Sequence, residues 1–202
     1  MLKDLITSCR SYRRFYQEVP VSPDELRDMI DNARLTGSAA NAQPLRYHFV
    51  HTPEDCAAVY PHLMWAAALK DWDGPEEGER PSAYIIMLTD LTVSKNPQWD
   101  EGIAAQTIML SAVEKGYGGC ILASCQRTEL LSLLGLDPSR YAIALVLALG
   151  KPKEEVKLVP ASPEGSIAYY RDENQVHYVP KRELKDILIW NEKACRLRFS
   201  DI

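Results

Sequence analysis

The sequence has few cysteines, and no two of them stand at the spacing of metal ligands. The five cysteines of this 202-residue chain are odd in number and scattered, which favours free thiols over a disulfide framework or a zinc site. The four histidines form no HExxH pattern, and no serine stands in a GxSxG elbow. The GxGxxG and GxxxxGK(S/T) patterns are also missing. Hydrolase, kinase and ordinary dinucleotide-fold sites are therefore not supported.

Positive charge and long apolar runs are also scarce. Lysine and arginine total 23 against 28 acidic residues, so the net charge is -5 and the surface repels nucleic acid and anionic lipid. No stretch approaches the ~20 apolar residues of a membrane span, and the N-terminal residues lack the apolar core of a signal peptide. With 46% apolar and 25% charged residues, the composition is globular. We expect a cytoplasmic protein with neither a membrane nor a nucleic-acid partner.

Periodicity and turn residues predict alternating helices and strands. The clearest helix begins after Ser22, a favoured N-cap residue, has Pro23 at its first position and ends before Gly37. The whole set comprises helices at 1–9, 22–37, 53–72 with an interruption at Pro61, 99–119 and 127–136, and strands at 46–52, 83–90, 118–124 and 141–150. The 99–119 helix is apolar enough to be central. This order fits either an α/β fold or a short mixed or antiparallel sheet around one helix.

Two segments lack periodicity. Residues 71–82 are acidic and rich in glycine and proline, which predicts a loop. The last fifty residues are irregular up to a short helical pattern at 181–190, and they carry apolar side chains such as Ile167 and Tyr170. Such a segment must lie on another surface, plausibly a second subunit. We therefore expect residues 1–202 to form a single domain with an extended C-terminal arm at about 152–202.

The first cluster that could bind a ligand lies after the N-terminal helix. It places three guanidiniums and a hydroxyl within about one helical turn, a geometry that suits a phosphate: Arg10, Ser11, Arg13 and Arg14. A solvated basic face that pairs with Asp4 and Glu18 explains the same residues.

Three further clusters are less specific. Ser38, Asn41 and Gln43 form a polar turn whose carboxamides could read the edge of a heteroaromatic ring, or could merely satisfy backbone groups. The glycines of residues 116–124 could let backbone N–H groups approach a ligand, or could only end a helix. Residues 179–182 are basic and could equally be an exposed charged loop.

Six segments, taken in order, resemble the FMN-dependent nitroreductase family. They are R-S-x-R-R-F at 10–15, P-V-S-P-D-E-L at 20–26, A-R-L-x-x-S-A-x-N-x-Q-P at 33–44, D-E-G-x-A-A-Q at 100–106, G-Y-G-G-C at 116–120 and L-G-K-P at 149–152. Together they cover most of the chain. No single motif decides, but their order and separations do.

The resemblance implies an α+β homodimer with a small mixed or antiparallel sheet around a central helix, swapped C-terminal arms and two FMN molecules at the subunit interface. It also gives the clusters one purpose. The FMN phosphate and ribityl chain would be held by Arg10, Ser11, Arg13, Lys181 and Arg182. The isoalloxazine or ribityl of the FMN bound by the partner subunit would be contacted by Ser38, Asn41 and Gln43. Backbone N–H groups near flavin N5 and O4 would come from Leu122, Ala123 and Ser124.

The activity that the resemblance implies is ping-pong transfer of hydride from NAD(P)H, through flavin N5, to a flat electron-poor acceptor such as a nitroaromatic or quinone. No catalytic acid–base pair is then needed, because the flavin carries the chemistry. Three alternatives stay open: reductive dehalogenation or flavin fragmentation on the same scaffold, a flavin-binding or sensory module without useful turnover, and a cofactor-free dimeric scaffold. The natural acceptor and the choice between NADH and NADPH are not encoded in any recognisable motif.

Several positions depart from the family pattern. Cys9 stands where the family usually has arginine, so a phosphate donor is missing unless Arg14 replaces it. Gly37 and Leu45 stand where proline and tryptophan are common. Residues 60–81, where family members differ in the cover of the flavin, could shape a substrate pocket or form a solvated loop.

Overall fold

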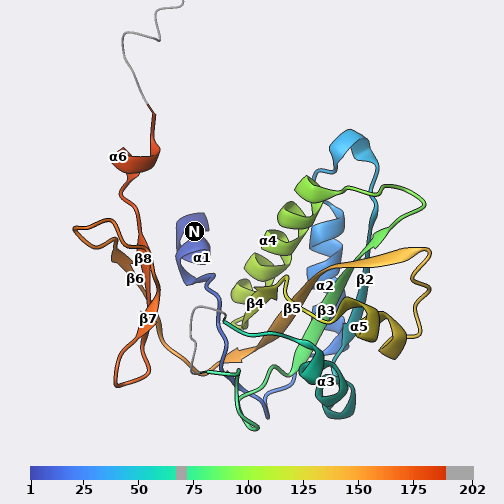
Figure 1. Cartoon of the computed structure of the whole chain (residues 1–202), viewed down its shortest axis with the longest axis horizontal. Helices are drawn as coiled ribbons and strands as arrows, with labels where there is room; N and C mark the ends of the chain where they lie inside the picture. The colour runs from blue at the N-terminus through green and yellow to red at the C-terminus, as the bar shows by residue number, and fades with distance from the viewer. Residues whose placement is uncertain (67–71, 190–202) are drawn as a thin grey trace, which may run out of the picture. The chain divides into compact units, whose positions relative to one another are not determined.

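The computed structural model describes residues 1–66 and 72–189, and the chain divides into two compact units (Figure 1). The first unit spans Met1–Glu155 and the second Val156–Ile202. The end of the helix predicted at 53–72 and the end of the helical pattern at 181–190 lie outside the described residues.

An antiparallel sheet forms the centre of the first unit. Its strands are β1 (Phe15–Tyr16), β2 (Leu45–Val50), β3 (Ala83–Asp90), β4 (Gly118–Leu122) and β5 (Tyr141–Pro152). Strand β5 pairs with β3 along one edge and with β4 and β1 along the other, and β2 completes the sheet beyond β3. All of these pairs are antiparallel, which confirms the α+β class over the α/β alternative.

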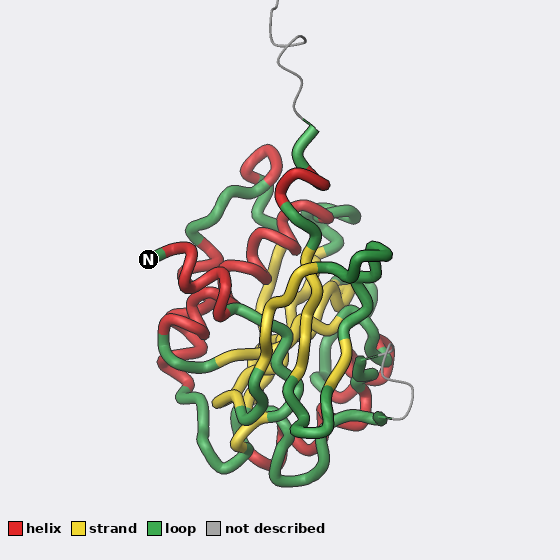
Figure 2. Tube along the Cα trace, turned by 90° about the vertical axis from the view of Figure 1, so that its left-hand side faces the viewer, coloured by secondary structure: helices red, strands yellow, loops and turns green. Residues whose placement is uncertain are grey.

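Helices cover both faces of this sheet. They are α1 (Leu2–Ser8), α2 (Pro23–Arg34), α3 (Pro53–Val59), α4 (Gln98–Glu114) and α5 (Arg127–Leu133). Ile85 and Met87 of β3 pack in the cluster that contains α2 and α4 residues, whereas Tyr84 and Ile86 pack in the cluster that contains α3 and α5 residues. Burial on both faces explains the continuous apolar run of β3. Loops, green in Figure 2, join most of these elements.

A local sequence signal accounts for the start of α2, whereas the end of α3 differs from the prediction. The hydroxyl of Ser22 accepts a hydrogen bond from the Glu25 amide at 3.3 Å, and the Glu25 carboxylate accepts one from the Ser22 amide at 3.0 Å, a capping box at the start of α2. The prediction of continued helix after Pro61 was wrong for residues 63–66. The 3-10 turn η2 (Tyr60–His62) follows α3, and Leu63 is extended and bridges to Cys125.

The second unit contains a small sheet that the sequence interpretation as an extended arm did not foresee. Strand β8 (His177–Lys181) pairs in parallel with β6 (Val156–Pro160) and antiparallel with β7 (Tyr170–Arg171). The short helix α6 (Leu184–Ile187) follows. The rings of Tyr170 and Tyr178 stack across the sheet with centroids 5.0 Å apart. The single-domain organisation with a swapped arm stays a prediction.

Candidate functional site

The predicted phosphate cluster lies beside the start of strand β4. Ser11 forms a parallel bridge with Gly119, and the Tyr12 amide donates a hydrogen bond to the Gly119 carbonyl at 2.9 Å. Two weak motifs of the sequence, the arginine cluster and the glycine run, are thereby brought together. A β-carbon on Gly118 would lie 2.5 Å from the Tyr12 ring, so only glycine allows this approach.

The cluster carries donors that suit a phosphate. Nη2 of Arg10 donates to the Ile6 carbonyl at 2.6 Å, but its buried Nε has no hydrogen-bond partner in the described part of the chain. Arg13 adds a second guanidinium, and its amide donates to the buried carboxylate of Glu154. A buried N–H without a partner is costly, so a ligand that brings anionic acceptors fits this position. The donor set therefore fits the phosphate of FMN.

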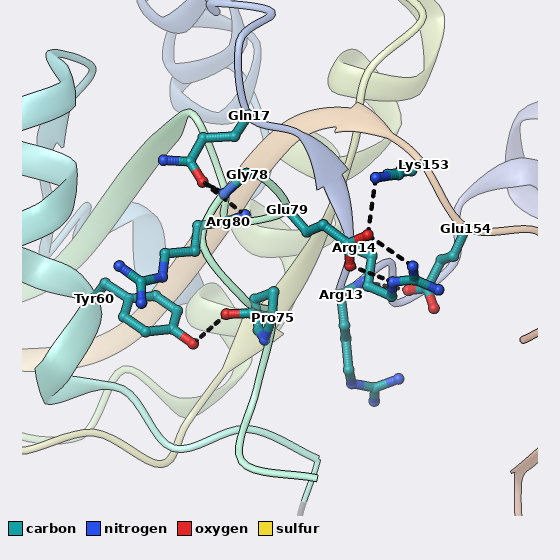
Figure 3. Close-up of polar contacts among 10 residues, drawn as sticks. All are labelled: Arg13, Arg14, Gln17, Tyr60, Pro75, Gly78, Glu79, Arg80, Lys153 and Glu154. Atoms are coloured by element: carbon teal, nitrogen blue, oxygen red, sulfur yellow. Dashed lines mark hydrogen bonds and ion pairs between the residues drawn. The ribbon is translucent and has the colours of Figure 1, made fainter.

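Arg14 does not replace the arginine missing at Cys9. Its Nε and Nη2 lie 2.5 and 2.7 Å from the two carboxylate oxygens of Glu79, and Nζ of Lys153 lies 2.9 Å from the same carboxylate (Figure 3). Cys9 is buried, and Nε2 of Gln106 donates to its Sγ at 3.5 Å. Burial raises the pKa of the Cys9 thiol. The predicted phosphate cluster is thus reduced to Arg10, Ser11 and Arg13.

The ion pair of Glu79 should make stability depend on acid pH. The Arg14 hydrogen bond, followed by that of Lys153, lowers the pKa of Glu79 from 4.5 to about 2. A depressed folded-state pKa adds stability above the unfolded value, and this stability is lost as pH falls from about 5 toward 2. Because the Glu79 side chain is 19% exposed, we expect Glu79→Gln to lower the free energy of unfolding at pH 7 by about 1–2 kcal/mol.

Urea unfolding at pH 7 and pH 3 measures this effect. The difference between the wild type and Glu79→Gln should shrink at pH 3, because Glu79 is then mostly protonated in the unfolded chain and must lose its proton on folding, whereas glutamine does not titrate. Glu76→Gln, a change at an exposed carboxylate of the same loop, is the matched control and should behave as the wild type at both pH values. An equal loss at pH 7 and pH 3 would contradict the charge-based explanation.

The polar turn at residues 38–43 is held by Asp100, a buried residue in the first turn of α4. Oγ of Ser38 donates to one Asp100 oxygen at 2.5 Å, and the Ala39 amide donates to the other at 2.9 Å. The Gln43 amide donates to Ser38 Oγ at 2.9 Å. Asp100 was not predicted as a site residue, although it opens the D-E-G motif; its role depends on a contact across 62 positions.

The same turn brings the two predicted carboxamides together. Nε2 of Gln43 donates to the Asn41 carbonyl at 3.2 Å and to Asn41 Oδ1 at 3.1 Å. Ala40, Asn41 and Gln43 all have φ between 50° and 54°, a left-handed conformation that needs support from the surrounding contacts.

A cavity of about 300 Å³ opens beside this turn, and Ser38, Gln43 and Asp100 line it. Tyr47 lines the same cavity, and burial, followed by the charge of Asp100, raises its pKa to about 12. Hydroxyl and carboxamide groups therefore face a space of small-molecule size.

The segment after β4 forms an exposed turn. Leu122 is buried, whereas Ala123 and Ser124 are exposed. The Ala123 carbonyl accepts a hydrogen bond from Arg127 Nη2 at 2.9 Å, and the Ser124 carbonyl accepts one from the Met64 amide at 3.1 Å. These bonds fix the turn on which the predicted backbone donors lie. Their contact with a flavin stays a prediction.

The remaining predicted residues, Lys181 and Arg182, belong to the second unit. Both are exposed, and the Lys181 carbonyl accepts a hydrogen bond from the Ala161 amide at 2.9 Å. Their part in phosphate binding stays a prediction.

Residues 6–151 match the profile of the Nitroreductase family. The chain belongs to this family. A CLA biosynthesis enone reductase from Lactiplantibacillus plantarum is 26% identical, over 76% of this chain and 87% of the relative. Among solved structures, a nitroreductase family protein from Streptococcus pneumoniae TIGR4 has a TM-score of 0.65 at 17% identity, over 85% of this chain and 100% of that one. A protein from Exiguobacterium sibiricum in complex with FMN has a TM-score of 0.68 at 18% identity, over 95% and 97%.

The nitroreductase fold is thus confirmed, as is the family resemblance seen in the six sequence segments. The protein is an oxidoreductase of the nitroreductase family. Within residues 1–66 and 72–189, no helix has the length and apolar character needed to cross a membrane. The described residues also hold no group of three or more histidine, cysteine or acidic side chains that could bind a metal ion.

Proposed function

We propose that this nitroreductase-family protein binds FMN and passes a hydride from NAD(P)H to a flat electron-poor acceptor, such as a nitroaromatic or quinone. The observation that carries the proposal is the position of Arg10, Ser11 and Arg13 beside Gly119, with a buried arginine N–H that has no partner among the described residues. The enone reductase relative adds enones to the acceptor classes that deserve a test.

Each cluster has a part in this function. Arg10, Ser11 and Arg13 bind the phosphate through charge-assisted hydrogen bonds. Ser38 and Gln43 orient the ring system, and the amides of Ala123 and Ser124 face its reactive edge. Bound FMN would supply the acceptance and donation of hydride. The chain therefore needs no acid–base pair of its own, only donors that favour the negative charge of the reduced ring.

A homodimer also belongs to the proposal, because the resemblance to the nitroreductase family implies one. In a dimer, the turn of one protomer completes the site formed by Arg10 and Arg13 of the other. The basic residues Lys181 and Arg182 then approach the same phosphate. Light scattering of the purified protein, with and without FMN, tests the dimer directly.

The activity is tested by anaerobic absorbance titration of the FMN-reconstituted protein with NADPH and with NADH. We expect either nucleotide to bleach the flavin band, and a nitroaromatic, quinone or enone to restore it. Bound flavin that neither nucleotide reduces would contradict the oxidoreductase proposal and favour a flavin-binding module. Failure to bind FMN at all would favour a cofactor-free scaffold.

Replacing Arg10 by glutamine should weaken FMN binding by roughly tenfold or more, because a hydrogen bond to a charged group contributes about 1.5–3 kcal/mol. Quenching of flavin fluorescence measures the dissociation constant. Arg27→Gln removes one exposed guanidinium from α2 and is the matched control, which should bind FMN as the wild type does. Equal weakening in both variants would mean that the overall charge matters and not the cluster.

A further inference from the structure

A second cavity of about 570 Å³ lies apart from the residues assigned to FMN. It is bordered by the 17–20 loop, the beginning of α3 and residues 77–82 that lead into β3. None of the predicted flavin-binding residues lines it.

Two residues that line this cavity carry buried polar atoms without hydrogen-bond partners among the described residues. Ser82 is 9% exposed, and its buried Oγ has no hydrogen-bond partner within the described ranges 1–66 and 72–189. The same holds for the buried Nε of Arg80. The Arg80 guanidinium lies over the ring of Tyr60, 4.2 Å from its centroid, which fixes the direction of the side chain (Figure 3).

The acceptors near these donors are already occupied. Oε1 of Gln17 accepts hydrogen bonds from the amides of Gly78 and Arg80, at 2.8 and 3.1 Å. The Ser82 carbonyl accepts one from Sγ of Cys56 at 3.4 Å. A ligand that satisfies this site must therefore bring acceptors to Ser82 and Arg80, which is what a carboxylate does.

The rest of the lining limits the kind of carboxylate. Glu18 and Glu77 are exposed residues of the lining and repel a second negative charge, whereas His51 adds a polar ring. Pro20, Pro53 and Pro81 supply apolar walls. We propose that this cavity binds a small organic monocarboxylate, with the carboxylate on Arg80 and Ser82 and an apolar body against the prolines.

Titration calorimetry of the full-length protein with benzoate tests this site, with neutral benzamide and doubly charged phthalate as comparison ligands. We expect saturable benzoate binding and roughly tenfold weaker binding of benzamide, which lacks the charge for a charge-assisted hydrogen bond. Phthalate should also bind more weakly than benzoate, because its second carboxylate is repelled by Glu18 and Glu77. The flavin absorption spectrum should not change, because the cavity is separate from the FMN residues. Benzoate that perturbs the flavin band would place the ligand elsewhere and overturn the proposal.

Two variants make the assignment specific. Arg80→Met and Ser82→Ala should each weaken benzoate binding by roughly tenfold or more, and both should leave the affinity for FMN unchanged. Arg27→Met is the matched control and should bind benzoate as the wild type. If Arg80→Met fails to fold, Ser82→Ala, a small change at one hydroxyl, still decides. Unchanged benzoate affinity in a folded variant, or no binding up to about 10 mM, would refute the site whether or not the protein reduces an acceptor.

Discussion

Gly119→Ala is expected to lower the free energy of unfolding by about 3 kcal/mol, the upper part of the usual range for overpacking. A β-carbon at this position would lie 2.3 Å from the carbonyl oxygen of Ala148 and 2.9 Å from Leu149 Cδ2. The carbonyl belongs to the backbone of the neighbouring strand β5, so it cannot rotate away. The pair of β4 and β5 must separate instead, and with it the strand that supports Ser11.

Gly102→Ala is the matched control, because it adds the same methyl group where nothing lies within 4 Å. Gly102 lies in the interior of α4, so alanine there should raise stability by about 0.5–1 kcal/mol. Urea unfolding of the two variants beside the wild type measures both effects. A loss of similar size in both variants would show that the close contact with β5 is not the cause.

Asp100→Ala is expected to cost about 3 kcal/mol of stability and to weaken FMN binding, because it removes the acceptor of two hydrogen bonds. The Ser38 hydroxyl and the Ala39 amide would both lose their hydrogen-bond partner. The loss is costly because Asp100 is only 4% exposed, so little water can replace its carboxylate. Three residues of the following turn have positive φ and depend on this support. Asp100→Asn keeps one acceptor oxygen and should lie between the alanine variant and the wild type.

Calorimetric unfolding and FMN titration check this expectation together. Asp31→Ala is the control, since it removes an exposed carboxylate bonded only at the surface to Arg34, an ion pair worth about 0–1 kcal/mol. FMN binding that survives Asp100→Ala unchanged would show that the 38–43 turn does not contribute to the flavin site.

Local signals were enough for much of the fold. Strand β3 was predicted at the residues where it occurs, because a continuous apolar run between turn residues is typical of a strand covered on both faces. The start of α2 was equally legible, because Ser22 suits an N-cap and Pro23 suits the first helical position. The small sheet of the second unit was not, since β6 pairs with β8 across 21 positions, counted from Val156 to His177, and strands this short carry little period.

In the candidate site, too, residue types could be predicted from local sequence, whereas contacts between distant segments could not. The residue types of the arginine cluster suggested a phosphate, but the sequence could not tell which arginines are available. Only the fold shows that Arg14 forms an ion pair with Glu79, 65 positions away. It also shows that the buried Nε of Arg10 has no hydrogen-bond partner among the described residues. The support of Ser38 by Asp100 was hidden for the same reason, because ion pairs and hydrogen bonds between distant segments leave no local pattern.

The ion pairs of Glu79 have a consequence for which neighbouring positions can change in sequence. Arg14 and Lys153 attach Glu79 to the ends of β1 and β5, only four residues before β3 begins at Ala83. An exposed side chain just before this anchor, such as that of Glu76, can therefore change without shifting the register of β3. The loop is in this sense held at its C-terminal end, so that sequence change beside Glu79 is separated from the sheet.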